Sequence, residues 1–100
     1  MQINRFFSTS PQLAYRPRDV RAARLSGGSV VVSWTGPVGA QYRVRAQSGP
    51  DSWRVVGRTM DTTIEDGGAQ GGAVPVYAVS ATVGQIRSAE TRSDEARSTR

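Results

Sequence analysis

The residues that could carry chemistry in this 100-residue sequence are carboxylates, hydroxyls and arginines, because it contains no histidine, cysteine or lysine. Without histidine it lacks the usual general base at neutral pH and the commonest metal ligand. Without cysteine it has no thiolate nucleophile, no disulfide and no cysteine zinc site. We therefore expect a small non-catalytic domain and not an enzyme.

Three acids in the middle of the chain, Asp61, Glu65 and Asp66, could bind calcium through oxygen ligands. Glu65 and Asp66 are adjacent, however, so in an extended chain they would point to opposite faces. A hydrolase with two catalytic carboxylates would need a cleft that so small a domain rarely forms. We expect no metal and no cofactor.

The glycine-rich run 67–73 could be interpreted as a phosphate-binding loop. It lacks the Gly-Lys-Ser/Thr ending of a P-loop, and no helix is predicted after it. A plain loop between two strands is the interpretation we prefer.

The sequence segments that contain these residues have the pattern of β-strands. Apolar residues alternate with polar or small ones, and turns containing glycine or proline separate the alternating segments. This pattern predicts antiparallel strands with one buried face each, in a sandwich or small barrel. The predicted core consists of Val32, Trp34, Tyr42, Val44, Trp53, Tyr77 and Val79.

The two faces of the alternation suggest different uses. The aromatic residues of the predicted core could instead stack on a sugar or on single-stranded nucleic acid, but their inward position favours packing. The outward side carries a small apolar patch rimmed by arginine, a composition enriched at protein interfaces, with a solvated sheet face as the alternative. This predicted outer patch consists of Arg43, Arg45, Val76 and Ala78.

The positive charge is concentrated near the N-terminus. Residues 1–24 hold five arginines against Asp19, which gives +4 of the total net charge of +5. Segment 1–16 is also rich in large apolar groups, so we predict that it is an arm that docks on a partner, with packing back onto the edge of its own sandwich as the alternative. The predicted contact residues of the arm are Ile3, Arg5, Phe6, Phe7, Leu13 and Tyr15.

The chain is thereby predicted to have three parts: the arm 1–16, a sandwich 17–92 and a polar tail 93–100. We find no apolar run long enough for a signal peptide or a membrane span. The expected location is a virion or the cytoplasm.

Residues 17 to about 92 resemble a fibronectin type III domain, particularly its bacterial form. The resemblance implies a seven-stranded sandwich with sheets ABE and C′CFG, no catalytic residues, and a role as a spacer or binding module. The matching segments, in chain order, are the opening Pro17 with 18–22, the Trp34 strand 28–34, the Tyr-x-Val strand 42–45, strands 53–59, 62–66 and 77–81, and a last strand from Ser88.

The resemblance has two departures. Pro75 stands where the family has its corner tyrosine, and Ala69 stands where it has the accompanying leucine. We therefore expect the 67–73 loop to be held differently, with Pro75 at the very start of its strand. The last strand also has no large inward residue, which leaves an immunoglobulin-like topology as an alternative.

Three hypotheses of function follow. The first is a non-catalytic structural or interaction protein in a larger assembly such as a tailed-bacteriophage virion, docking on self or other subunits through the arm and the outer sheet face. The second is a protein-binding or spacer module from a larger actinobacterial protein. Nucleic-acid binding through the basic arm ranks third, and we expect no membrane partner.

Overall fold

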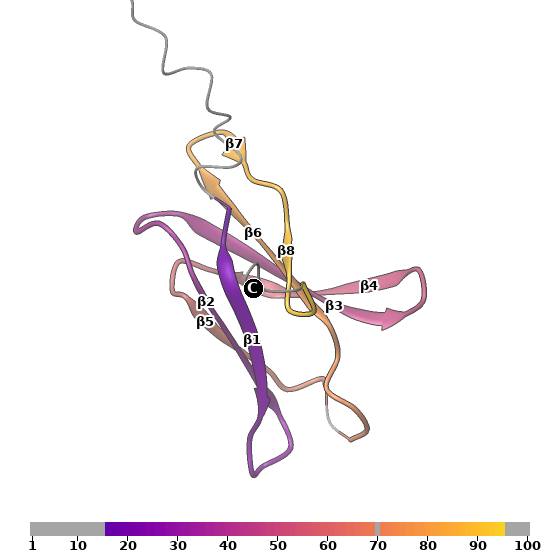
Figure 1. Ribbon diagram of the computed structural model, residues 1–100. Helices are drawn as coiled ribbons and strands as arrows, with labels where there is room; N and C mark the ends of the chain where they lie inside the picture. Colours follow the sequence, from indigo (N-terminus) through magenta and orange to yellow (C-terminus); the bar gives the residue numbers. More distant parts are fainter. Residues whose placement is uncertain (1–15, 70, 96–100) are drawn as a thin grey trace, which may run out of the picture.

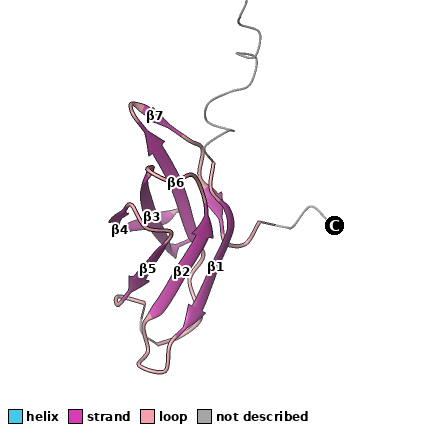
Figure 2. Cartoon of the chain, turned by 90° about the vertical axis from the view of Figure 1, so that its left-hand side faces the viewer, coloured by secondary structure: helices cyan, strands magenta, loops and turns pink. Residues whose placement is uncertain are grey.

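The computed structural model describes residues 16–69 and 71–95. Two antiparallel sheets face each other, as the views in Figures 1 and 2 show, and this confirms the predicted all-β sandwich. The smaller sheet has the order β1-β2-β5, and the larger has β4-β3-β6-β7 with β8 also paired to β6. The strands among the described residues are β1 (Arg18–Arg24), β2 (Val30–Thr35), β3 (Gln41–Gly49), β4 (Ser52–Thr59), β5 (Thr63–Asp66), β6 (Tyr77–Val83), β7 (Ile86–Arg87) and β8 (Thr91–Arg92).

The core lies between the two sheets and follows from the alternation of the sequence. Every second residue of β2, β3 and β6 points inward, so each of these strands contributes one apolar face. Trp34 and Tyr42 meet edge to face with their ring centroids 5.3 Å apart. Six of the predicted core residues are buried here: Val32, Trp34, Tyr42, Val44, Tyr77 and Val79.

The prediction that Trp53, the seventh residue, belongs to the core is wrong. A bulge between the pairs Val44–Gly57 and Arg45–Val55 inserts one extra residue, Val56, into β4. Because the side-chain period of a strand is two, one extra residue changes which face the side chains beyond it occupy. Trp53 therefore lies on the outer face of the larger sheet, and Val56 is the β4 residue that packs against the core.

The last predicted strand is present but interrupted. β7 pairs with the end of β6, and β8 pairs with its beginning. Between them Ser88 turns inward, where its Oγ accepts a hydrogen bond from the Ala81 amide at 2.9 Å and its own amide donates to the Ala81 carbonyl at 2.7 Å. The expected seven strands are thus eight among the described residues, because the last one is divided in two.

Residues just outside the first and last strands contact each other and the larger sheet. Arg16 forms an ion pair with Glu95 at 2.7 Å, across the start and end of the described chain. The Ser93 amide donates to the Tyr77 carbonyl at 2.8 Å, and Ser93 Oγ accepts from the Tyr77 amide at 2.9 Å. Ser93, in the turn after β8, is therefore hydrogen-bonded to the first residue of β6.

Candidate functional site: the outer face of the larger sheet

The outward side of the larger sheet holds three of the four residues of the predicted outer patch, Arg43, Arg45 and Ala78, and several residues that were not predicted. We define this outer face by the side chains that strand alternation and register place on it. They are Arg43, Arg45 and Gln47 of β3, Trp53, Val55 and Arg58 of β4, Ala78, Ser80 and Thr82 of β6, Arg87 of β7 and Arg92 of β8.

The centre of the outer face is a stack of arginines on Trp53. The guanidinium carbon of Arg45 lies 5.0 Å from the centre of the Trp53 ring, and that of Arg92 lies 5.6 Å away. Both distances are within the range of cation–π attraction. Trp53 comes from β4, Arg45 from β3 and Arg92 from β8, so the stack joins strands across the whole sheet.

Both arginines of the stack are neutralised by acids from the last part of the chain. Arg45 donates two hydrogen bonds to Glu90, at 2.6 and 2.7 Å. Arg92 donates two to Asp94, both at 2.9 Å. The hydrogen bond from Arg45 to Glu90 outweighs the cost of burial and raises the pKa of Arg45 above its ordinary value. Paired in this way, the stack carries no net charge.

The next row of the outer face is not neutralised. Arg43 on β3 lies directly opposite Arg58 on β4 in the strand register, and opposite Ser80 on β6. Like charges directly opposite each other destabilise a sheet, and among the described residues no carboxylate forms an ion pair with either arginine. The Nε of Arg43 and the Oγ of Ser80 are both buried without a hydrogen-bond partner.

The outer face therefore has an excess of positive charge. Five arginines, Arg43, Arg45, Arg58, Arg87 and Arg92, share it with two paired acids, Glu90 and Asp94. The excess lies on Arg43, Arg58 and Arg87. Such a face attracts anionic groups and steers their approach.

Part of the predicted outer patch is corrected. Ala78 is only 1% exposed, because it lies between Arg45 and Arg92 in the register and these long side chains cover it. Ala78 therefore cannot be a direct contact residue. Val76 is partly exposed and lies just before β6, where its carbonyl accepts a hydrogen bond from the Gln47 amide at 2.8 Å.

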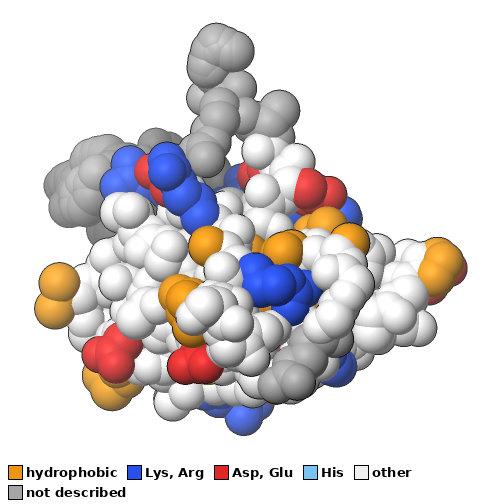
Figure 3. All heavy atoms as spheres, turned by 90° about the horizontal axis from the view of Figure 1, so that it is seen from below, with side chains coloured by type: hydrophobic (Ala, Val, Ile, Leu, Met, Phe, Trp, Pro, Cys, Tyr) orange, Lys and Arg blue, Asp and Glu red, His pale blue; other side chains and the backbone are white. Residues whose placement is uncertain are grey.

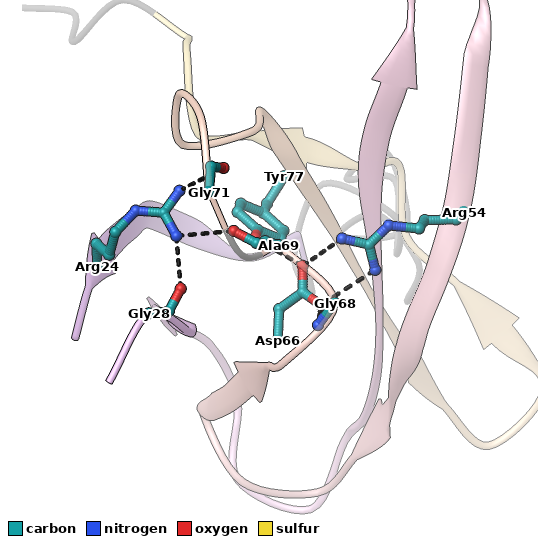
Figure 4. Close-up of polar contacts among 8 residues, drawn as sticks. All are labelled: Arg24, Gly28, Arg54, Asp66, Gly68, Ala69, Gly71 and Tyr77. Carbon is teal, nitrogen blue, oxygen red and sulfur yellow. Dashed lines mark hydrogen bonds and ion pairs between the residues drawn. The ribbon is translucent and has the colours of Figure 1, made fainter. Parts of the chain in front are cut away.

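A second polar cluster lies between the sheets at the end of β5 (Figure 4). Asp66 is 3% exposed and accepts two hydrogen bonds from Arg54, at 2.6 and 3.0 Å. The Tyr77 hydroxyl donates to the same carboxylate at 2.7 Å, and the Gly68 amide donates at 3.0 Å. We refer to Arg54, Asp66, Gly68 and Tyr77 as the buried network.

The buried network shifts the pKa values of its members. Burial alone would raise the pKa of Asp66, but the hydrogen bonds from Arg54, Tyr77 and the Gly68 amide outweigh it and hold the pKa below its ordinary value. Burial, with the hydrogen bond to Asp66, raises the pKa of Tyr77 well above its ordinary value. The carboxylate is charged, and its hydrogen-bonding capacity is used by the protein itself.

Arg24 holds the glycine-rich loop that follows the buried network. Its Nη1 donates to the carbonyls of Gly28 at 2.5 Å and Ala69 at 2.8 Å, and its Nη2 donates to that of Gly71 at 3.4 Å (Figure 4). Nη2 also donates to the Gly72 carbonyl at 3.0 Å. Ala69 is 7% exposed and belongs to the core. Arg24 and the buried network thus both hold this loop. Pro75 does not begin its strand as expected, because β6 starts two residues later, at Tyr77.

The acids considered for calcium do not converge. Asp66 is directed inward, whereas Glu65 points outward and accepts a hydrogen bond from Ser29 Oγ at 2.5 Å. Asp61 is exposed in the turn before β5. In the described part of the chain, no group of three or more metal-ligating side chains comes together. No helix in that same part has the length and apolar character needed for crossing a membrane.

Several residues of the outer face were not predicted from the sequence, and the predicted arm residues lie outside the described ones. Arg58 and Arg87 occupy outward positions, but the bulge in β4 and the interruption of the last strand conceal their register. The pairing of Glu90 with Arg45 of β3 could not be predicted, because it depends on which strands are neighbours. Ile3, Arg5, Phe6, Phe7, Leu13 and Tyr15 fall within 1–15, so their role stays a prediction.

Comparison with solved structures agrees with this architecture. A structure described as the crystal structure of a Fn3-like protein from Clostridium thermocellum superposes with a TM-score of 0.59, at 24% sequence identity. The match covers 76% of this chain and 86% of the other. No family model matches the sequence, and no curated protein matches it. The fold is therefore Fn3-like, an antiparallel sandwich with the ABE and C′CFG arrangement of strands.

Proposed function

We propose that this protein is a non-catalytic interaction module whose outer face binds an acidic protein surface within a larger assembly. The observation that carries the proposal is the row of Arg43 and Arg58, directly opposite each other, beside the unpartnered hydroxyl of Ser80. Carboxylates of a partner would relieve the repulsion between the two arginines and accept their hydrogen bonds.

A protein partner fits this face better than a nucleic acid. Single-stranded nucleic acid is held largely by stacking of bases on aromatic rings. The aromatic ring of the outer face, Trp53, already has the guanidinium groups of Arg45 and Arg92 against it. A pure spacer, the other alternative, would have no use for an uncompensated pair of arginines.

Our prediction of the kind of assembly is based on the sequence alone. A virion component of a tailed bacteriophage remains our prediction, with the arm 1–16 as a second docking element. The outer face contributes charge complementarity and specificity in either a virion or a multidomain protein.

The proposal is tested with a fluorescein-labelled decaglutamate peptide at low ionic strength, by fluorescence anisotropy. The double variant Arg43→Glu/Arg58→Glu should lower the affinity at least about tenfold, because it replaces two attractive charges by two repulsive ones. The matched control is Arg18→Glu/Arg21→Glu, which reverses two exposed arginines on the smaller sheet.

Equal losses in the two double variants would mean that only net charge matters and would contradict the proposal. A single-stranded oligothymidylate of ten nucleotides is titrated alongside. If it binds more tightly than the peptide through the same arginines, nucleic-acid binding replaces our proposal.

A further inference from the structure

A shallow hollow lies at one end of the outer face, between the β3–β4 hairpin and the segment that leads into β6. It has a volume of about 390 Å³ and is lined by Gln47, Gly49 and Pro50 on one side and by residues 73–76 on the other. Val74 is 40% exposed, and Val76 and Pro75 are partly exposed. Figure 3, which views the molecule from below, shows apolar side chains close to basic groups on that side of the surface.

The hollow is continuous with the outer face. Gln47 lines it, and Gln47, Arg45 and Arg43 are alternate residues of β3, so their side chains share one side of the sheet. Val76 lines the hollow from β6's side and is hydrogen-bonded to Gln47. The apolar hollow and the charged row are thus two ends of one surface, with the neutral Trp53 stack between them.

The distance between these two ends sets a spacing for any ligand that bridges them. From Gln47 to Arg43 is four residues along β3, which is about 13 Å of extended chain. The intermediate row is already neutralised, because Arg45 is paired with Glu90. Moving away from the hollow, the first arginines without an ion pair to a described carboxylate are therefore Arg43 and Arg58. They lie about four residues from the hollow.

We propose that the outer face recognises an extended protein segment with a bulky aliphatic side chain, followed about four residues later by two carboxylates. The aliphatic side chain fills the hollow against Val74 and Val76, and the carboxylates bind Arg43 and Arg58. This inference rests on the proposed function and specifies the partner of the same face. Apolar anchoring next to charge recognition also gives the selectivity that charge alone lacks.

The arm of a second copy does not fit this description. Residues 1–18 contain Arg5, Arg16 and Arg18 and no acid, so the arm has the same sign of charge as the row it would have to meet. Like charges brought together across an interface disfavour association. The arm of a second copy is therefore excluded, and we assign the occupant to a segment of another protein.

Three capped peptides test the inference, each titrated into the full-length protein and followed by two-dimensional NMR. They are Leu-Ser-Ser-Ser-Glu-Glu, Ser-Ser-Ser-Ser-Glu-Glu, and Leu-Glu-Glu-Ser-Ser-Ser. The first should bind about tenfold more tightly than the second, since burial of a leucine side chain contributes about that much. It should also bind more tightly than the third, whose carboxylates lie too close to the anchor.

Two double variants then locate the anchor. Val74→Ser/Val76→Ser removes apolar surface from the hollow and should abolish most of the preference for leucine. The matched control, Val38→Ser/Met60→Ser, removes two other exposed apolar side chains and should leave it intact. The dispersion of the NMR spectrum verifies that both variants are folded.

The outcomes separate the two proposals. If the glutamate peptides bind through Arg43 and Arg58 but leucine adds nothing, the anchor is overturned while the proposed function stands. If leucine binding survives the Val74/Val76 variant, the hollow is not the anchor site. If neither glutamate peptide nor decaglutamate binds, both proposals fail.

Discussion

Two clusters in this molecule are built from arginines and carboxylates but differ in burial and in charge balance. In the buried network, Asp66 receives hydrogen bonds from Arg54, Tyr77 and the Gly68 amide and is 3% exposed. On the outer face, Arg45 and Glu90 form a comparable two-bond ion pair, but their side chains are 27% and 29% exposed. The row beside that pair, with Arg43 and Arg58, has no acid bound to it among the described residues.

The difference indicates what each cluster is for. A buried carboxylate costs free energy unless every donor around it is well placed, so the buried network fixes the fold and leaves no capacity for a ligand. Arg58 is exposed, so water screens part of the repulsion between Arg43 and Arg58, and the row retains donors for a partner. The buried network, whose charges are balanced, thus has a structural role, whereas the unbalanced charge of the outer face is suited to binding.

The largest expected effect comes from breaking the buried network. Asp66→Asn should lower the free energy of unfolding by about 3 kcal/mol, because it leaves Arg54 without its counter-charge in a partly buried site. Urea denaturation followed by tryptophan fluorescence measures the change. A loss under about 1 kcal/mol would show that Arg54 finds equivalent solvation elsewhere and that the network is not essential to the fold.

The pH dependence of the free energy of unfolding provides a second test of the buried network. The pKa of Asp66 in the folded protein lies below its ordinary value, so the unfolded chain binds a proton at higher pH than the folded one. The contribution of Asp66 is present in full above about pH 5 and is lost as the pH falls through the folded pKa. The urea midpoint should therefore fall below about pH 4 in the wild type and fall less steeply in Asp66→Asn. Parallel pH curves would contradict this assignment.

The smallest expected effect is on the outer face. Glu90→Gln should change the free energy of unfolding by no more than about 1 kcal/mol, because Arg45 is exposed enough to be solvated and keeps its contact with Trp53. The same variant adds one uncompensated positive charge to the outer face, so decaglutamate should bind more tightly. A loss as large as that of Asp66→Asn would erase the distinction between the two clusters.

Much of the fold could be predicted from the period of the sequence. The alternation in residues 30–34, 42–46 and 77–81 places the inward residues of β2, β3 and β6 correctly, since strand periodicity is a local property. Trp53 was misplaced because a bulge has no clear signature in β4. Ala78 was misjudged because its cover comes from Arg45 and Arg92, which belong to other strands.

The candidate site was predicted only in part for a related reason. Arg43 and Arg45 were recognised as outward from β3 alone. Arg45 is neutralised by Glu90, 45 positions away in the sequence, whereas Arg43 has another arginine, Arg58, as its cross-strand partner. Arg24 and the buried network likewise join segments that are separated in the sequence.

The sequence by itself determined the class of the fold, the absence of histidine and cysteine chemistry, and the inward face of the central strands, because composition and period are local facts. Only the tertiary structure decided which arginines are paired and which are not. Charge balance depends on which strands are neighbours and in which register they pair, and the chain sets that register through bulges and turns whose effect appears only when the sheets come together.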